Sequence, residues 1–164
     1  MMKYIDDKTI DDVLEAMDTI EEDYVQMMDN FEQNQPVVVD FLSKENLSIL
    51  SDDERDYLDY LALAIYQSIV KVYKNVPELT EEQIGEAEEK NWEILELVKG
   101  TDFSERLTMF FDGHPQEDLL AFVEDSLVDD PDDEEAQLDF LTDEGREPMF
   151  IALKSVIDAF HKAL

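Results

Sequence analysis

The chain contains no cysteine, so disulfides, thiolate metal sites, iron–sulfur clusters and cysteine nucleophiles are excluded. Its four glycines lie too far apart to form a loop that cradles phosphate, and the Gly-x-Ser-x-Gly motif of serine hydrolases is absent. We therefore expect a protein without a cofactor. Any catalytic activity would have to use an arrangement of residues that no motif reveals.

Basic residues are also scarce. The 164 residues include 12 Lys and Arg against 44 Asp and Glu, which gives a formal net charge of −32. The excess of acids is spread over both halves of the sequence and is not confined to a tail. Such a surface repels phosphate backbones and anionic lipids, so we expect no direct binding to nucleic acid or to a membrane. Basic proteins and cations are the partners that it would attract.

The sequence has no long uninterrupted apolar run, and no apolar segment near Met1 of the kind that directs secretion. These absences predict a protein that neither spans a membrane nor is exported by a standard signal. The missing cysteines fit a reducing compartment, and we predict a cytoplasmic protein.

Apolar residues, in contrast, are plentiful and regularly spaced. They make up 44% of the chain, enough for a core in a protein of this size. They recur at intervals of three and four, the spacing of a helix with one buried face. β-branched residues cluster only at Val37 to Val39, directly after a proline that suits a helix start. The sequence predicts an all-α fold: a single acidic domain, residues 1–164, built as a bundle of about six to eight helices.

The first helix is predicted over Thr9–Phe31, because its apolar residues form one continuous stripe. The stripe consists of Ile10, Val13, Leu14, Met17, Ile20, Tyr24, Met27, Met28 and Phe31. This face either packs inside the chain's own bundle or pairs with a second copy, as in a coiled coil. No clear alternation of charge accompanies the stripe, so packing within the bundle is favoured, and a homodimer through this helix is the alternative.

Helix-start signals place the remaining helices. Ser51–Glu54 and Thr80–Gln83 have the spacing of a capping box, in which two side chains satisfy backbone N–H groups at the helix start. The helix after the first box is apolar on most sides over Tyr57–Tyr73 and is predicted to be central. Further helices are expected from Pro36, over 84–98, 104–111 and 119–127, from Asp130 to Phe140, and from Pro148 to the last residue.

Residues 35–73 resemble residues 116–160. Both begin with a glutamine and a short apolar helix, continue through an acidic helix start and end in a long apolar helix. This agreement indicates an internal duplication of two helical hairpins around the Tyr57–Tyr73 and Phe150–Leu164 helices, and shared helical spacing alone is the competing explanation. Repeated helix pairs commonly bind other proteins, which moves the expected function in that direction.

The densest group of charges has six acids in seven residues around Pro131: Asp129, Asp130, Asp132, Asp133, Glu134 and Glu135. Such closely spaced oxygen atoms could bind a cation or a basic peptide, and we take this cluster as the candidate binding site. The EF-hand pattern is not met, because the sixth position from Asp130 is Glu135 and the twelfth is Leu141. A helix start with acids on its N-terminal dipole explains the same residues and is favoured.

His114 and His161 are the only histidines. A di-iron bundle requires Glu-x-x-His on two helices, whereas Phe111 and Asp158 hold the corresponding positions here, so that site is excluded. Asp158 and His161 share a helix face, but a histidine near a helix C-terminus usually interacts with the helix dipole. His114, within a Gly-His-Pro sequence, is interpreted as part of a turn or cap. No metal site is predicted.

Three functions are compatible with these features. A non-catalytic interaction or scaffold protein for a basic or helical partner is favoured by the missing motifs and the acidic helical surface. A carboxylate-based protein that binds divalent cations, or an enzyme of that kind, is the first alternative. A nucleic-acid-mimicking inhibitor is the second, although charge spread over the whole chain gives such an inhibitor no preferred face.

Overall fold

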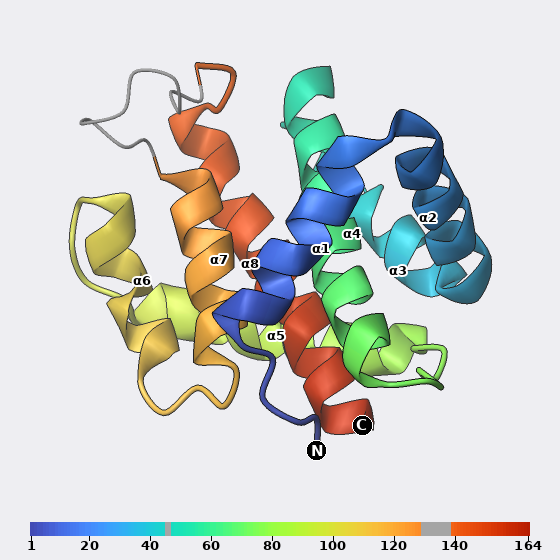
Figure 1. The fold of residues 1–164 in the computed structure, drawn as a ribbon. Coiled ribbons are helices and arrows are strands. Elements are labelled where there is room, and N and C mark those ends of the chain that lie inside the picture. Colours follow the sequence, from blue (N-terminus) through green and yellow to red (C-terminus); the bar gives the residue numbers. More distant parts are fainter. Residues whose placement is uncertain (45–46, 129–138) are drawn as a thin grey trace.

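Eight helices and no strand make up the part of the chain that the computed structural model describes, which is residues 1–44, 47–128 and 139–164 (Figure 1). The helices are α1 (Asp7–Thr19), α2 (Glu21–Asn34), α3 (Pro36–Leu42), α4 (Asp52–Val72), α5 (Glu81–Leu97), α6 (Phe103–Phe111), α7 (Glu117–Leu127) and α8 (Asp143–Ala163). The predicted all-α fold is confirmed.

Helices α4 and α8 lie at the centre of the bundle. Each is 21 residues long, and each buries more residues than any other helix. In Figure 1, α1 crosses in front of α4 and α7, while α5 crosses behind α8. Helices α2 and α3 cover the outer side of α4, and α7 lies against α8 and carries α6 on its far side. The two central helices are thus covered on most sides.

Aromatic rings join the central helices to their neighbours. Tyr66 on α4 packs against Phe31 on α2, with ring centroids 4.9 Å apart, and against Phe160 on α8 at 5.9 Å. Phe150 on α8 meets Phe110 on α6 edge to face at 5.3 Å. Burying a ring of this size contributes about 1.5–3 kcal/mol relative to leaving it exposed. One continuous core therefore extends from α2 through α4 and α8 to α6.

The predicted single helix over Thr9–Phe31 is wrong, because the chain breaks at Ile20 into α1 and α2. Ile20 has extended backbone angles, φ −131° and ψ 117°. The hydroxyl of Thr19 donates to the carbonyl of Glu15 and closes the last turn of α1. Three acids follow in the first turn of α2, where their charges suit the helix dipole. The break lets α1 pack on α4 and α7 while α2 turns towards α3 and α4.

Glu54 caps two helices at once. Both predicted capping boxes form, and in the first of them Oε1 of Glu54 accepts the N–H of Ser51 at 3.0 Å. Its other oxygen, Oε2, accepts the N–H and the hydroxyl of Thr142, the residue before α8, at 3.1 Å each. The predicted start of the last helix at Pro148 is therefore wrong. The helix begins at Asp143, because a carboxylate from a distant part of the chain caps it there.

Two buried glutamines hold the extended segments that lead into α5 and α1. Gln35, the residue before α3, donates from Nε2 to the carbonyl of Pro77 at 2.9 Å, and its Oε1 accepts the N–H of Leu79 at 2.9 Å. Gln35 has no exposed surface. We call this arrangement the Gln35 clamp, and it joins the start of α3 to the segment before α5.

The Gln116 clamp repeats this arrangement at the start of α7. Nε2 of Gln116 donates to the carbonyl of Lys3 at 2.9 Å, and Oε1 accepts the N–H of Ile5 at 3.0 Å. The backbone angles agree too, with φ −122° and ψ 60° at Gln116 against φ −135° and ψ 59° at Gln35. Each clamp therefore binds the carbonyl of one residue and the N–H of the second residue after it.

Candidate functional site

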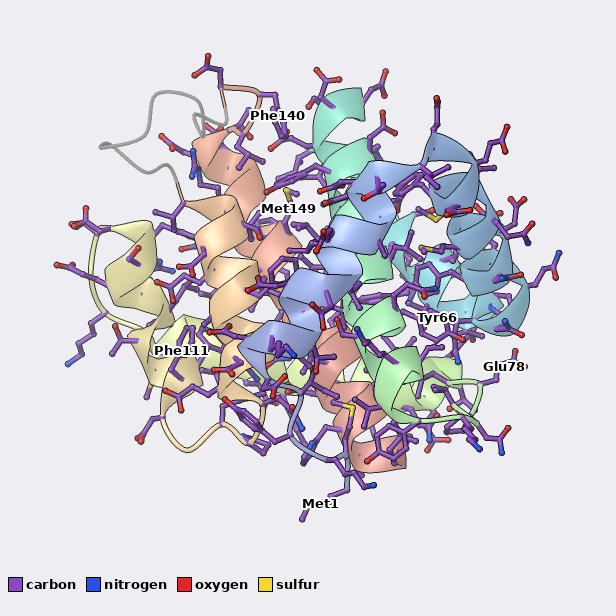
Figure 2. All side chains as sticks on the ribbon, in the orientation of Figure 1. Met1, Tyr66, Glu78, Phe111, Phe140 and Met149 are labelled. Carbon is purple, nitrogen blue, oxygen red and sulfur yellow. The ribbon has the colours of Figure 1, made fainter. Side chains whose placement is uncertain are left out.

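Three tyrosines and a phenylalanine form a row of rings on the surface. Tyr24 on α2 stacks on Tyr60 on α4 with ring centroids 6.2 Å apart, and Tyr60 stacks on Tyr57 at 6.3 Å. Tyr57 meets Phe140 edge to face at 5.2 Å. Figure 2 shows Phe140 at the upper end of the bundle, close to the start of α4. All four residues are half-buried. We call Tyr24, Tyr57, Tyr60 and Phe140 the aromatic row.

Carboxylates surround the aromatic row. Asp18, near the end of α1, accepts the hydroxyl of Tyr60 at 2.9 Å. Burial and the negative charges of Asp59, Asp56 and Asp18 raise the pKa of Tyr24, and burial and Asp18 raise the pKa of Tyr60. The phenols therefore stay protonated at neutral pH, and the carboxylates supply the charge. We call the aromatic row together with Asp18, Asp56 and Asp59 the tyrosine face.

The negative charge of Asp59 is disfavoured by its surroundings in the tyrosine face. Burial raises the pKa of Asp59 to about 6, and repulsion from Asp56 and Glu32 acts in the same direction, while Arg55 partly offsets these effects. At neutral pH the folded protein thus holds a carboxylate whose negative charge its surroundings disfavour. A cation placed beside Asp59 would relieve the repulsion among the neighbouring acids.

Acids also crowd the contact between α1 and α7. The carboxylate of Asp118 accepts the N–H of Asp7 at 3.0 Å. Repulsion from Asp118, followed by desolvation and the charges of Asp11 and Asp125, raises the pKa of Asp7. Negative charge therefore continues from the tyrosine face along α1, the helix that crosses the front of the bundle in Figure 1.

The predicted binding cluster lies outside the described residues, as does most of the predicted helix from Asp130 to Phe140. It comprises Asp129, Asp130, Asp132, Asp133, Glu134 and Glu135. Described residues on both sides of this cluster contact Tyr57. The Tyr57 hydroxyl donates to the carbonyl of Ser126 in α7 at 2.6 Å, and Phe140 packs on the same ring. One residue of the aromatic row, Phe140, therefore follows this cluster closely in the sequence.

A buried ammonium group lies between α5 and α8. Nζ of Lys154 donates to Oδ1 of Asn91 and to Oδ2 of Asp158, both at 2.7 Å, and lies 5.6 Å from the centre of the Phe110 ring. Nδ2 of Asn91 donates in turn to Oγ of Ser155 and to Oδ2 of Asp158, each at 3.1 Å. These bonds compensate the burial of the charge and fix α5 against α8.

His114 forms the predicted turn and also joins this buried group. Its backbone N–H donates to the carbonyl of Phe111 at 3.2 Å, and its ring atom Nδ1 accepts the backbone N–H of Gln116 at 3.0 Å. The other ring nitrogen, Nε2, lies 2.8 Å from Oδ1 of Asp158. Burial opposes the charge of Asp158, but the bonds from His114 and Lys154 outweigh it and hold the pKa of Asp158 below its ordinary value. His114 therefore connects the start of α7 to the C-terminal half of α8.

Asp158 also borders a cavity of about 190 Å³ between α5 and α8. The cavity is lined by Gln83, Glu86, Ala87, Lys90, Asp158, Ala159 and Lys162. Two acids and two bases share this lining, so it does not select a ligand by the sign of its charge. Within the described ranges, no three His, Asp or Glu side chains are grouped closely enough to hold a metal ion.

Neither the tyrosine face nor the buried Lys154 was predicted from the sequence. Tyr57 and Tyr60 lie three residues apart within a helix that is apolar on most sides, so they do not stand out from the core pattern. The neighbouring Asp56 and Asp59 gave no signal either, because acids are common throughout the chain. Lys154 is the only charged residue between Phe150 and Ile157, and a charge inside such an apolar run indicates a buried, paired group.

None of the helices in the described part of the chain is both long and apolar enough to cross a membrane. Comparison with protein-family models, with curated proteins and with solved structures finds no match for this chain. Its function therefore has to be argued from its own residues.

Proposed function

We propose that this chain is a non-catalytic binding protein that engages a basic segment of another protein through the tyrosine face. The observation that carries the proposal is the stacking of Tyr24, Tyr60 and Tyr57 beside the carboxylates of Asp18 and Asp59. Aromatic faces attract Lys and Arg side chains by about 0.5–2 kcal/mol, more when the contact is desolvated. Carboxylates beside the rings add charge complementarity.

The raised pKa of Asp59 supports a cationic partner in particular. A bound Lys or Arg would stabilise the ionised form of Asp59, so binding should release a proton near pH 6. Binding should therefore become tighter as the pH rises through this value. A neutral or acidic partner would gain nothing from ionised Asp59.

The two alternative functions would depend on carboxylates and not on aromatic rings. A nucleic-acid-mimicking inhibitor would need an array of negative charges that resembles phosphates, and a divalent-cation protein or enzyme would need oxygen atoms that converge on one point. The aromatic row has no role in either, which favours the basic partner.

Titration with a peptide tests the proposal. The probe is a blocked octapeptide of alternating Lys and Arg, added in 0.15 M salt, where general attraction between distant charges is screened. Chemical shifts of Tyr24, Tyr57 and Tyr60 should move first. The triple variant Asp18→Asn, Asp56→Asn, Asp59→Asn should raise Kd about tenfold.

The control removes three charges from the opposite side of the bundle. Glu89, Glu93 and Glu96 lie exposed on α5, behind the central helices in Figure 1. Their combined replacement by Gln should change Kd by less than about threefold, because exposed charges at a distance contribute little in salt. If both triple variants weaken binding equally, the tyrosine face has no special role and the proposal fails.

The homodimer through the first helix and the cytoplasmic location stay predictions. Ile10, Val13 and Met17 of α1 are buried in the chain's own core, so a second copy would contact the exposed residues of this helix. An acidic surface of this density also opposes self-association at low salt.

We further infer that residues 35–73 and 116–160 belong to two copies of one helical unit. The matched clamps at Gln35 and Gln116 support this, as do the equal lengths of α4 and α8. One exposed ion pair joins each central helix to the helix that follows a clamped segment. Nζ of Lys71 lies 3.2 Å from Asp12, and Nζ of Lys162 lies 3.3 Å from Glu86.

A further inference from the structure

The two glutamine clamps differ in their contacts with histidine. Both histidines of the chain contact Gln116, so the Gln35 clamp has none. His114 contacts the backbone of Gln116 through Nδ1 at 3.0 Å, and Nδ1 of His161 lies 3.3 Å from Nε2 of the Gln116 side chain. The chain thus contains a titratable clamp and, as an internal reference, a clamp of the same geometry that cannot titrate in the same range.

The hydrogen bonds determine which atoms of the two rings must be free of protons. Oε1 of Gln116 accepts the N–H of Ile5, so the other side-chain atom is the amide nitrogen, which can only donate. Nδ1 of His161 must therefore accept. The backbone N–H of Gln116 is likewise a donor, so Nδ1 of His114 must accept as well, and the proton of His114 lies on Nε2, facing Asp158.

Protonation of His161 at Nδ1 reverses this polarity. An imidazolium is a donor at both nitrogens, so an N–H of the His161 ring would face an N–H of Gln116. One side-chain N–H of Gln116 would then be displaced. This change acts on the residue that holds Lys3 and Ile5.

The charged groups that act on His161 are Asp158, His114 and the N-terminal ammonium of Met1. Asp158 on α8 keeps its own charge through bonds to His114, Lys154 and Asn91, and this negative charge favours a positive charge on His161. The Met1 ammonium and His114 disfavour a positive charge on His161.

We propose that the Gln116 clamp is an acid-sensitive latch, which releases the segment 2–5 and loosens α1 from α7 when His161 becomes protonated, while the Gln35 clamp stays closed. This inference does not rest on the function proposed for the tyrosine face. It assigns to His161 a conformational role that the buried group around Lys154 does not require.

The sign of the effect follows from His161. Burial, repulsion from His114 and the Met1 ammonium lower the pKa of His161, although Asp158 opposes them. A histidine whose pKa is lower in the closed form binds its proton more readily when the clamp is open. The closed form is therefore fully stable above the ordinary histidine pKa near 6.5 and loses stability as the pH falls from there towards the lowered value.

Amide hydrogen exchange measures the two clamps in the same sample. The N–H of Ile5 reports the Gln116 clamp and the N–H of Leu79 reports the Gln35 clamp, and both residues are buried. After correction for the intrinsic pH dependence of exchange, lowering the pH from 7.5 to 5.5 should reduce the protection of Ile5 severalfold, because His161 binds its proton more readily when the clamp is open. The protection of Leu79 should stay constant.

Asparagine at the two histidine positions provides the matched variants. The Oδ1 of Asn can accept a hydrogen bond near the place of Nδ1 and does not titrate. In the double variant His114→Asn, His161→Asn, the ratio of Ile5 to Leu79 protection should no longer depend on pH.

The single variant His161→Asn covers the case in which the double variant does not fold. It retains the contact between His114 and Asp158, and its ratio of Ile5 to Leu79 protection should likewise not depend on pH. Two results would overturn the latch: Ile5 and Leu79 losing protection in parallel in the unmodified protein, or a pH response that survives removal of the histidines.

Discussion

The Oε2 atom of Glu54 occupies the space that a side chain on Gly145 would fill. Gly145 lies in the first turn of α8, and a Cβ added to it would overlap this carboxylate oxygen and also approach Oγ1 of Thr142 at 3.0 Å. Glu54 belongs to α4, but its carboxylate lies beside the first turn of α8. There it takes the place that a glutamate at position 145 of α8 itself would have in a capping box. The absence of a side chain at Gly145 is what lets the two central helices share one cap.

Gly145→Ala should therefore destabilise the protein by about 2 kcal/mol or more, because Glu54 must move or lose its bonds to Thr142. Urea unfolding at pH 7 measures the change. Gly85→Ala is the control, since a Cβ there meets nothing within 4 Å in the middle of α5. This second substitution should stabilise the protein by about 0.5–1 kcal/mol through helix propensity. Equal effects of the two substitutions would contradict the shared cap.

Glu54→Gln should lower stability at neutral pH and matter little in acid. Burial opposes the charge of Glu54, but the hydrogen bonds from Ser51 and Thr142 outweigh burial and lower its pKa. A carboxylate with a lowered pKa stabilises the fold above its unfolded pKa of about 4.3, and this contribution is lost as the pH falls through the folded value. The stability gap between the two proteins should therefore close below about pH 4.

The unfolding free energy in urea, measured from pH 3 to pH 7, checks this expectation. Glu144→Gln serves as the control, because Glu144 lies exposed in the first turn of α8 and has only the helix dipole to lose. Its effect should stay below about 1 kcal/mol at every pH. A gap for Glu54→Gln that does not change with pH would show that packing, and not charge, makes Glu54 important.

Lys154→Met should cost about 2–3 kcal/mol, because it leaves Asn91 and Asp158 without their buried donor. This cost is smaller than that of breaking a fully buried ion pair, because the Asp158 side chain keeps 26% of its surface exposed. Lys162→Met, about two turns later on the same helix, should cost less than about 1 kcal/mol, because its pair with Glu86 is exposed. Thermal melting of both variants provides the comparison, and similar costs would argue against a structural role for the buried ammonium.

Asp59→Asn should stabilise the folded protein above pH 6. The pKa of Asp59 is raised to about 6, so the fold loses stability as the pH rises from the unfolded pKa of about 3.9 to this value, and the loss is complete above it. Removing the charge should gain on the order of 1 kcal/mol at pH 8, less than the full shift implies because the group is partly exposed. The gain should vanish near pH 4, where both side chains are neutral in the folded state. Asp29→Asn, an exposed change on α2, should show no such dependence.

The sequence predicted those helices whose start signals are local. Ser51 and Thr80 form capping boxes with residues three positions away, so these hydrogen bonds could be predicted from four consecutive residues. The break at Ile20 was hidden because the apolar stripe keeps its spacing across it. Only the acids after Ile20, which suit a new helix start, could have indicated that the chain turns there.

The site could not be predicted for a different reason. Glu54 with Thr142, and Lys154 with Asn91, are pairs brought together by packing between distant helices, and no spacing rule connects them. The same holds for Tyr24 and Tyr60. With 44 acids in the chain, proximity of carboxylates in the sequence carries no information, so only the three-dimensional arrangement separates the strained Asp59 from the rest.

The two glutamine clamps also imply an order of assembly. Gln35 and the carbonyl that it binds are separated by 42 residues, whereas Gln116 and the carbonyl of Lys3 are separated by 113. Closing the longer loop costs about 0.9 kcal/mol more chain entropy, so the Gln35 contact should form earlier on the folding pathway. The Gln116 clamp links α7 to residues near the start of the chain, so the C-terminal half cannot complete its hydrogen bonds alone. The chain should fold in one cooperative step whose final event is the docking of residues 2–5.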